Sequence, residues 1–233
     1  MNGFAPPPDS RFREALSEQV RLSALRREAP LPEKVRYVAG ADVSCRLWGR
    51  TFWGGFAVCD LEEGFAVADS AVVRMEVDFP YVPGLLAFRE VPVLAEAYSL
   101  LRVRPDAVLV DAQGTAHPRR FGSAAHLGVA LGVPTVGCAK SRLCGEHGEP
   151  GPERGAFSPL LLEGETVGAV LRTRAGVRPV YVSPGHLSDL TTCLDLVLRC
   201  SPRWRLPEPI RRAHLLVNGA RRGAARRDGR PSR

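Results

Sequence analysis

The feature that most constrains this chain is a short apolar run that ends in a carboxylate. Val108, Leu109 and Val110 lead directly into Asp111, and a turn that contains Gly114 follows. A fully apolar run is typical of a strand buried on both faces, as in the parallel part of an α/β sheet. Because ligands of open α/β sheets bind where strands end, we expect functional chemistry beside Asp111.

Three basic side chains follow this strand end within ten residues, namely His117, Arg119 and Arg120. A carboxylate beside histidine and arginine suits metal-assisted chemistry on a phosphate. The same residues could form an ordinary turn with surface arginines. The segment alone leaves both interpretations open, so the rest of the chain has to decide between them.

Hydrophobic periodicity and turn residues predict a single-domain α/β fold with a mixed sheet. Three antiparallel strands are followed by alternating helices and strands, which is the order of a ribonuclease H-like sheet. In that fold, metal-binding carboxylates gather from separate strands. The expected strands are 37–45, 51–61, 65–77, 108–111, 135–139, 166–174 and 179–183, the expected helices are 9–27, 88–101, 121–131, 188–199 and 207–217, and 143–157 is expected to be a loop.

The first expected helix carries apolar residues at helical spacing, namely Phe12, Leu16, Val20 and Leu25. Asp9 or Ser10 could cap its first turn.

The positive charge is concentrated at the C-terminus. Residues 220–233 contain six arginines and one aspartate, which is +5 of the formal charge of +7. We therefore expect a near-neutral catalytic domain over residues 1–219 and a basic, disordered tail over 220–233. Such a tail could contact nucleic acid or another polyanion, or could only solvate the terminus.

Six cysteines occur without a C-x-x-C pair, and no metal-ligand spacing of the zinc type is present. Reduced, mostly buried thiols of a cytoplasmic protein are expected. The N-terminal residues lack the pattern of a signal peptide, and no apolar run reaches the length of a membrane span. We expect a monomer without a membrane partner.

Three carboxylates occupy positions that suit a metal site. Asp42 interrupts an apolar strand, Glu90 lies early in an expected helix, and Asp111 ends the buried strand. A charge inside a strand must be paired, bind a metal or face water. Hard oxygen ligands favour Mg²⁺ or Mn²⁺. Taken separately, Asp42 could face solvent and Glu90 could lie on an ordinary helix surface.

A proline-rich loop, residues 79–84, places Tyr81 between Pro80 and Pro83. Two prolines stiffen the loop around this single aromatic side chain. A rigid aromatic residue can wedge into a base stack while an enzyme extrudes a base. A tyrosine buried in a tight turn is the plainer alternative.

Several motifs in order along residues 36–219 resemble the endonuclease V family. They are A-G-A-D-V-S (39–44), P-Y-V-P-G-L-L-A-F-R-E (80–90), V-D-A-Q-G-T-A-H-P-R-R (110–120), H-L-G-V (126–129), V-G-C-A-K-S (136–141) and L-P-E-P (206–209). The resemblance implies a Mg²⁺-dependent nuclease, with Mn²⁺ as a substitute, that acts on DNA containing deaminated purines, chiefly hypoxanthine. It also implies cleavage of the second phosphodiester 3′ to the lesion, which leaves 3′-hydroxyl and 5′-phosphate ends.

The resemblance implies a catalytic role for five residues. Asp42, Glu90 and Asp111 would hold the metal, and His214 would be a fourth polar group beside it. Lys140 would place a compact positive charge near the scissile phosphate or the attacking water, which a lysine supplies better than an arginine.

Other residues would bind the nucleic acid by the same resemblance. Tyr81 with Pro80 and Val82 would be the wedge, and His117 would contact the phosphate backbone. Four residues would shape the pocket, largely through backbone groups, and these are Gly84, Leu86, Ala139 and Ser183. Pro83 and Ala112 would also lie at the nucleic acid.

The chain departs from the family pattern in two places. Ala112 stands where the family has glycine, so its methyl group could crowd an extruded base. After Gly185 and His186, the run Leu187-Ser188-Asp189 differs from the usual order. This second departure is expected to move a helix cap and to leave the chemistry unchanged.

Three other interpretations stay open. Residues 132–141 nearly match a phosphate-binding P-loop, but two residues separate Gly137 from Lys140 and the segment reads as a strand. A non-catalytic binding module of the same fold is possible, although clustered carboxylates would disfavour phosphate binding. Finally, RNA containing inosine could be the main substrate, because a contact to a 2′-hydroxyl leaves no readable motif.

Overall fold

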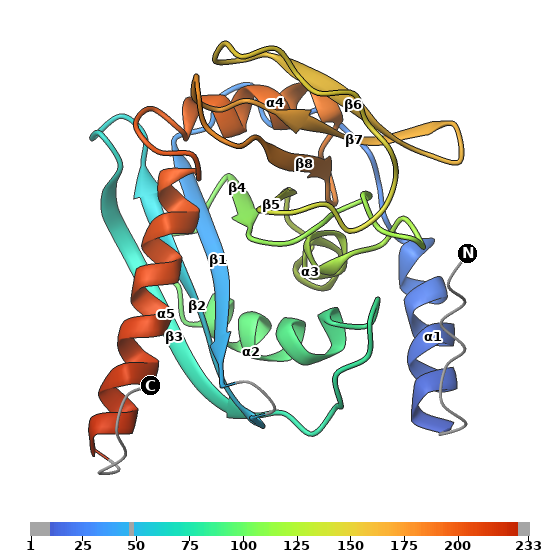
Figure 1. Ribbon diagram of the computed structural model, residues 1–233. Helices are drawn as coiled ribbons and strands as arrows, with labels where there is room; N and C mark the ends of the chain where they lie inside the picture. The colour runs from blue at the N-terminus through green and yellow to red at the C-terminus, as the bar shows by residue number, and fades with distance from the viewer. Residues whose placement is uncertain (1–9, 47–48, 228–233) are drawn as a thin grey trace.

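A computed structural model describes residues 10–46 and 49–227 and contains one eight-stranded mixed sheet (Figure 1). The strands lie in the order β3-β2-β1-β4-β5-β8-β7-β6. The strands are β1 (Tyr37–Cys45), β2 (Thr51–Asp60), β3 (Ala66–Glu76), β4 (Ala107–Val110), β5 (Thr135–Ala139), β6 (Phe157–Leu162), β7 (Glu165–Leu171) and β8 (Val180–Pro184). The helices are α1 (Ser10–Ser23), α2 (Ala87–Ser99), α3 (Ser123–Leu131), α4 (Leu190–Arg199) and α5 (Glu208–Arg227).

The first five strands have the arrangement expected from the sequence. Strands β1, β2 and β3 form an antiparallel meander, and β4 and β5 run parallel to β1. Strands β8, β7 and β6 then extend the sheet with antiparallel pairs. The ribonuclease H-like α/β fold with a single sheet is therefore confirmed.

Strand β6 was not expected. Its sequence, Phe157–Leu162, follows a segment rich in glycine and proline and contains Pro159. β6 is the edge strand of the sheet beside β7, and on its outer side it forms only an isolated bridge between Leu161 and Glu146, so the missing N–H of Pro159 is tolerated there. Two of its large apolar side chains, Phe157 and Leu161, are exposed.

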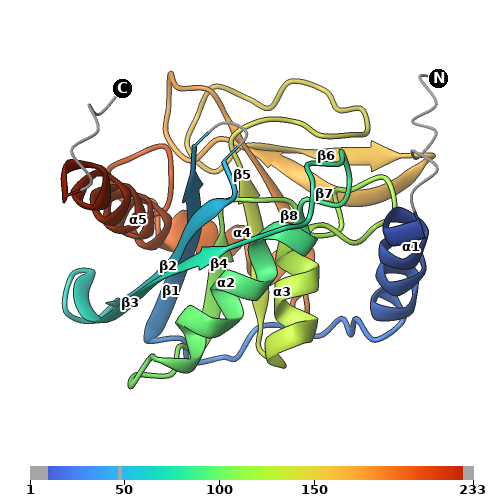
Figure 2. The ribbon, with the colours of Figure 1, turned by 90° about the horizontal axis from the view of Figure 1, so that it is seen from below.

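Helices cover both faces of the sheet (Figure 2). On one face, α2 and α3 pack on Ala39 and Ala41 of β1 and on alternate residues of β4. On the other face, α4 and the start of α5 pack on Val38 and Leu109. The alternation of buried residues along each central strand therefore divides the core into two layers.

The position of α5 depends on a very close approach to β1. A Cβ atom on Gly40 would lie 2.0 Å from the carbonyl oxygen of Pro209, so only glycine fits at this point of the strand. Ile210, in the first turn of α5, is fully buried in the same layer. The contact directs the helix along β1, toward the strand end that carries Asp42.

The expected disorder of residues 220–233 is wrong for 220–227. These residues form the last turns of α5, while 228–233 lie outside the described residues. Alanine and arginine are strong helix formers and continue a helix already anchored on the sheet. Arg221 also donates from Nε to the hydroxyl oxygen of Ser44, 2.9 Å away, so part of the basic segment packs on the domain.

The apolar residues of the segment 9–27 are buried only in part: Phe12 is buried and Leu16 packs against the same cluster. Phe12 and Ala15 are buried together with the polar Gln19, whereas Val20 and Leu25 are 61% and 51% exposed. The three buried residues share one face of the helix. The helix begins at Ser10, and Asp9 lies outside the described residues.

At the start of α4, Asp189 is the N-cap and accepts a hydrogen bond from the backbone N–H of Thr192. The helix expected over 188–199 therefore begins at Leu190. In the part of the chain that the structure describes, no helix combines the length and apolar character that crossing a membrane requires.

Candidate metal and nucleic-acid site

The sheet brings two carboxylates side by side. Strands β1 and β4 are parallel, and their register pairs Ala41 with Val110. Asp42 and Asp111 each follow that pair by one residue. Ala41 and Val110 face the layer of α2 and α3, so alternation directs both carboxylates toward the α5 side of the sheet. Their side chains are only 13% and 10% exposed.

Helix α5 adds an imidazole to this pair. Nδ1 of His214 lies 2.8 Å from Oδ2 of Asp42. One ligand atom from each of Asp42, Asp111 and His214 lies within 4.8 Å of the others. Burial raises the pKa of Asp42, and the neighbouring charge of Asp111 raises it further, while the hydrogen bond to His214 opposes the shift. Two carboxylates and an imidazole at this spacing could hold a divalent cation.

Glu90 approaches from the opposite layer. It lies in the first turn of α2, and among the described residues its carboxylate is not part of the 4.8 Å group. Burial raises the pKa of Glu90 to about 7; a hydrogen bond from Ser123 opposes the shift, and the charges of Asp42 and Asp111 add to it. Glu90 is therefore electrostatically coupled to the cluster.

Lys140 lies immediately after β5 and forms an ion pair with Asp111. Its backbone carbonyl accepts a hydrogen bond of 2.8 Å from Nη2 of Arg205, which fixes the strand end. Gly137 lies within β5 and pairs with Val110 of β4. The segment is thus a central strand and not a P-loop, which requires a turn between a strand and a helix.

A pocket of about 250 Å³ adjoins Asp111. Its volume is below the roughly 300–1,000 Å³ of drug-sized ligand sites, which suits a single base. Seven of the expected nucleic-acid-binding residues line it, and these are Tyr81, Pro83, Gly84, Leu86, Ala112, His117 and Ala139. The wedge candidate Tyr81 is 54% exposed at the pocket, so it is not the buried turn residue of the plainer alternative.

Three expected binding residues do not line this pocket. Ser183 is fully buried, and its Oγ accepts a hydrogen bond of 2.8 Å from the backbone N–H of Gly114. Val82 packs in an apolar cluster with Leu85 and α1. Pro80 lies beside Tyr81 in the loop but outside the lining. Ser183 and Val82 support the pocket from behind.

His117 is buried and does not lie on the surface that a phosphate backbone would contact. It is 4% exposed and lines the pocket. Burial lowers the pKa of its imidazole to about 4, so the ring is neutral at pH 7. Its Nδ1 accepts a hydrogen bond of 3.1 Å from the backbone N–H of Arg119. A cationic contact between His117 and the phosphate backbone does not fit this environment.

Sequence reasoning missed part of the pocket wall. Gln19 of α1 lines it from a segment far away in the sequence. The other missed residues are Ala87, Gln113, Phe121, Gly122, Ser123, Ser141, Arg142 and Leu143. The position of Gln19 on the buried face of an amphipathic helix was the available signal, because a polar residue there needs buried partners.

Two grooves that contain several arginines flank the acidic cluster. Beyond Lys140, a groove is lined by basic residues that include Arg142, Arg178 and Arg205. Beyond His214, Arg46, Arg74 and Arg221 line another groove together with Trp53. Arginine clusters of this kind are typical of surfaces that contact phosphates.

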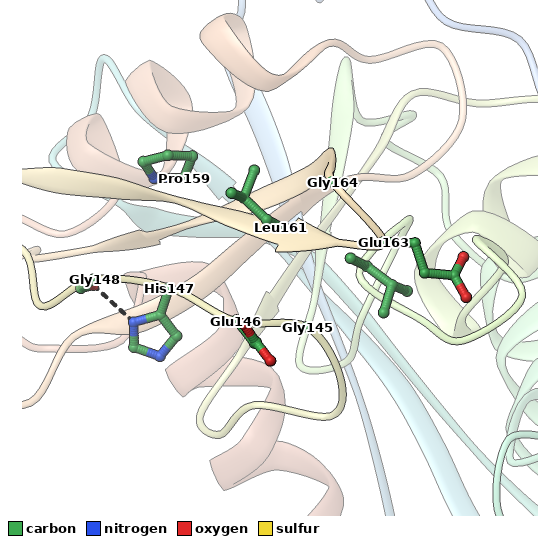
Figure 3. A pocket seen from close by; sticks show the side chains of 9 residues that line it. Gly145, Glu146, His147, Gly148, Pro159, Leu161, Glu163 and Gly164 are labelled. Atoms are coloured by element: carbon green, nitrogen blue, oxygen red, sulfur yellow. Dashed lines mark hydrogen bonds between the residues drawn. The ribbon is translucent and has the colours of Figure 1, made fainter. Parts of the chain in front are cut away.

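A further open groove lies between the loop at residues 145–148 and the β6–β7 hairpin (Figure 3). Its lining includes His147, whose Nδ1 lies 2.8 Å from the carbonyl oxygen of Gly148. None of the expected site residues lines this groove. The acidic cluster and the 250 Å³ pocket therefore remain the candidate site.

Known proteins resemble this chain over most of its length. The sequence model of the Endonuclease V family matches residues 14–215. The chain belongs to the endonuclease V family. A curated endonuclease V from Myxococcus xanthus is 52% identical over 221 residues, which cover 93% of this chain and 94% of that protein. Family membership makes the protein a nuclease and therefore a hydrolase.

Solved endonuclease V structures share the fold. The Streptomyces avermitilis enzyme has a TM-score of 0.88 and 39% identity, with 94% of this chain and 96% of that chain covered. The Ciona intestinalis endonuclease V has a TM-score of 0.81 and 26% identity, with 93% and 100% covered. The Ciona protein was crystallised with a 24mer DNA that contains an inosine followed by a ribo-adenosine.

Proposed function

We propose that this member of the endonuclease V family is a Mg²⁺-dependent endonuclease that acts on DNA containing deaminated purines, chiefly hypoxanthine. It cuts the second phosphodiester bond 3′ to the lesion and leaves 3′-hydroxyl and 5′-phosphate ends. The observation that carries the proposal is the direct contact between an acidic cluster and a base-sized pocket, since Asp111 belongs to both.

The donor set fits a hard divalent cation. Asp42 and Asp111 would hold the ion with Glu90, and His214 would complete the polar surroundings. The pKa of Asp42 is raised partly by Asp111, and a cation would relieve this repulsion. When bound, such an ion supplies activation of water and charge stabilisation at a phosphate. Mn²⁺ satisfies the same oxygen-rich set and would substitute.

The chain's own residues then orient and neutralise the substrate. The ammonium group of Lys140 lies at the carboxylate of Asp111, so it would place positive charge beside the scissile phosphate. His214 keeps Asp42 oriented through its 2.8 Å contact. The two arginine-lined grooves would hold the strand on either side of the cut.

The pocket would receive an extruded base while Tyr81 fills the gap that the base leaves. An exposed aromatic ring beside the pocket entrance supports this division of roles. His117, being neutral and buried, would shape the pocket wall rather than contact the phosphate backbone.

A nicking assay tests the proposal. DNA and RNA oligonucleotides of the same sequence, each with one central inosine, are incubated with the protein in Mg²⁺, in Mn²⁺ and in EDTA. We expect the DNA to be cut at the second phosphodiester bond 3′ to inosine, and only when a metal is present. The undamaged control should not be cut. Preferential cleavage of the RNA would make the protein an inosine-specific ribonuclease. Binding without cleavage would make it a binding module.

We also propose a cytoplasmic, monomeric enzyme. The six cysteines are free thiols in the structure, and four of them are buried, which suits a reducing compartment. Light scattering at micromolar concentration tests the monomer: a mass near 25.3 kDa is expected.

A further inference from the structure

Helix α1 contacts α3 but does not itself cover a face of the sheet (Figure 1). Its buried face contacts the loop of residues 79–86, which comprises the proline-rich loop around Tyr81 and the two residues that lead into α2. Phe12 and Ala15 share an apolar cluster with Leu85 of that loop. Phe12 also meets Phe79 edge to face, with ring centroids 6.1 Å apart. The helix therefore forms one support of the loop.

Gln19 lies on the same face and is 1% exposed. Its Nε2 donates to the carbonyl oxygen of Gly84 at 3.0 Å and to that of Phe121 at 3.1 Å. Its Oε1 accepts a hydrogen bond of 2.5 Å from Nε of Arg119. Both N–H groups of the Gln19 amide and its carbonyl oxygen therefore have hydrogen-bond partners around the pocket.

Arg119 closes the network. Its Nη2 donates to the same carbonyl oxygen of Gly84 at 2.7 Å, so this oxygen receives two donors. Gly84 has a φ of +79°, and a Cβ atom there would lie 2.6 Å from Nη2 of Arg119. The positive φ favours glycine, and a side chain there would also have to displace the end of Arg119. Gln19 and Arg119 therefore hold the loop in one conformation at Gly84, which lines the pocket.

The chain after α1 is itself fixed to the domain. Arg26 donates from Nε to the carbonyl oxygen of Gly185 at 2.7 Å, and the backbone N–H of Leu187 donates to the carbonyl oxygen of Arg27 at 2.8 Å. These bonds tie the segment to the turn between β8 and α4. The helix can therefore act as a fixed support rather than as a mobile arm.

We propose that Gln19 is a positioning residue that fixes the loop of residues 79–86, and through it Tyr81, against the base pocket. The inference rests on the proposed function of that pocket. Gln19 does not need to touch the reacting atoms; it orients the loop through Gly84 and Arg119. Loss of its amide leaves Arg119 Nε without its partner and removes one of the two donors to Gly84.

The first test does not use activity. Hydrogen exchange of the full-length protein compares wild type, Gln19→Met and the control Glu14→Gln, whose side chain is exposed on the same helix. We expect at least about tenfold faster exchange in residues 79–86 of Gln19→Met, since a buried hydrogen-bond network of this kind is worth about a factor of ten. Peptides from β4 and β5 should exchange as in wild type.

The second test uses nicking of inosine DNA. Gln19→Met should raise KM and lower the preference for inosine over undamaged DNA by about tenfold, with kcat changed less than about threefold. The effect should be non-additive with Tyr81→Ala, because both changes act on the same loop. Glu14→Gln should match wild type.

The outcomes separate the two proposals. If the wild-type protein does not nick inosine DNA, the proposed function is overturned. Hydrogen exchange in residues 79–86 still tests the positioning role of Gln19 in that case. Unchanged loop exchange in Gln19→Met, or effects additive with Tyr81→Ala, overturns the positioning role. If Gln19→Met does not fold, Gln19→Glu keeps the acceptor for Arg119 and removes the donor to Gly84. This variant must then show the same loop-specific exchange, or the inference is wrong.

Discussion

His214 Nδ1 contacts Oδ2 of Asp42 at 2.8 Å across 172 positions of sequence. The contact joins the end of β1 to the middle of α5. It exists because Gly40 lets the start of α5 approach the strand so closely. One carboxylate is thereby held between an imidazole and the neighbouring Asp111.

The first prediction concerns this carboxylate. Asp42→Asn keeps the shape and a possible contact with His214 but removes the charge. We expect nicking of inosine DNA to fall by at least about a hundredfold, while affinity for the uncut strand in EDTA stays within about threefold, because base recognition lies elsewhere. Asp195→Asn, on the exposed face of α4, is the control. Activity of Asp42→Asn within tenfold of wild type would contradict the assignment.

The second prediction uses the fact that the chain has only two lysines. Lys140→Met removes the cation paired with Asp111 and should lower kcat by about 10²–10³-fold, the usual cost of one electrostatic contact at a reacting centre. Lys34→Met removes an exposed lysine and should have no effect. Single-turnover nicking with enzyme in excess measures both. Equal rates for the two variants would remove Lys140 from the site.

The third prediction concerns Tyr81 as the wedge. Tyr81→Ala should reduce the preference for inosine over undamaged DNA by roughly 5- to 150-fold, since loss of aromatic stacking costs about 1–3 kcal/mol. Tyr81→Phe keeps the ring and should retain most of the preference. Competition between labelled damaged and undamaged duplexes gives the ratio. An unaltered ratio in Tyr81→Ala would leave the residue only a loop role.

The fourth prediction concerns Ala112, which lines the pocket. Its methyl group reduces the space for an extruded base. Ala112→Gly should therefore raise the rate on xanthine, which carries an additional oxygen, more than the rate on hypoxanthine, and leave the fold intact. Parallel nicking assays on the two lesions measure the ratio, and the unfolding midpoint checks the fold. If the ratio of the two rates does not change, the methyl group does not limit the pocket.

The fifth prediction concerns acid stability. His126 is buried between Phe88 and Phe121, with its Nδ1 unpartnered. Burial lowers the pKa of His126 to about 4 from 6.5. As the pH falls, His126 is therefore protonated in the unfolded chain before it is protonated in the folded protein. The contribution of this group to stability is complete above pH 6.5 and is lost as the pH falls toward 4.

Replacement of His126 by phenylalanine should remove that loss. We expect the fall in unfolding free energy between pH 7 and pH 4 to shrink by about 3 kcal/mol, the value of a shift of this size. Urea denaturation at several pH values measures the difference. A variant that loses stability with acid as steeply as wild type would show that His126 does not cause the effect.

Much of the site could be predicted from local sequence. The apolar run before Asp111 and the interrupted strand at Asp42 indicated two adjacent strand ends, because a strand buried on both faces consists almost entirely of apolar residues. The structure confirmed the antiparallel meander and the parallel strands that follow it, and placed the two carboxylates together. The length of α5 was misjudged because arginine and glycine indicated disorder, whereas packing on β1 extends the helix.

The sequence by itself determined the mixed sheet, the family motifs and every strand except β6, because each depends on the side chains of neighbouring positions. Tertiary structure alone decided which distant groups meet. Gln19 contacts Gly84 across 65 positions, and the burial of His117 depends on the loops around it. Such contacts arise when loops close and helices pack, and they leave no periodic signal in the local sequence.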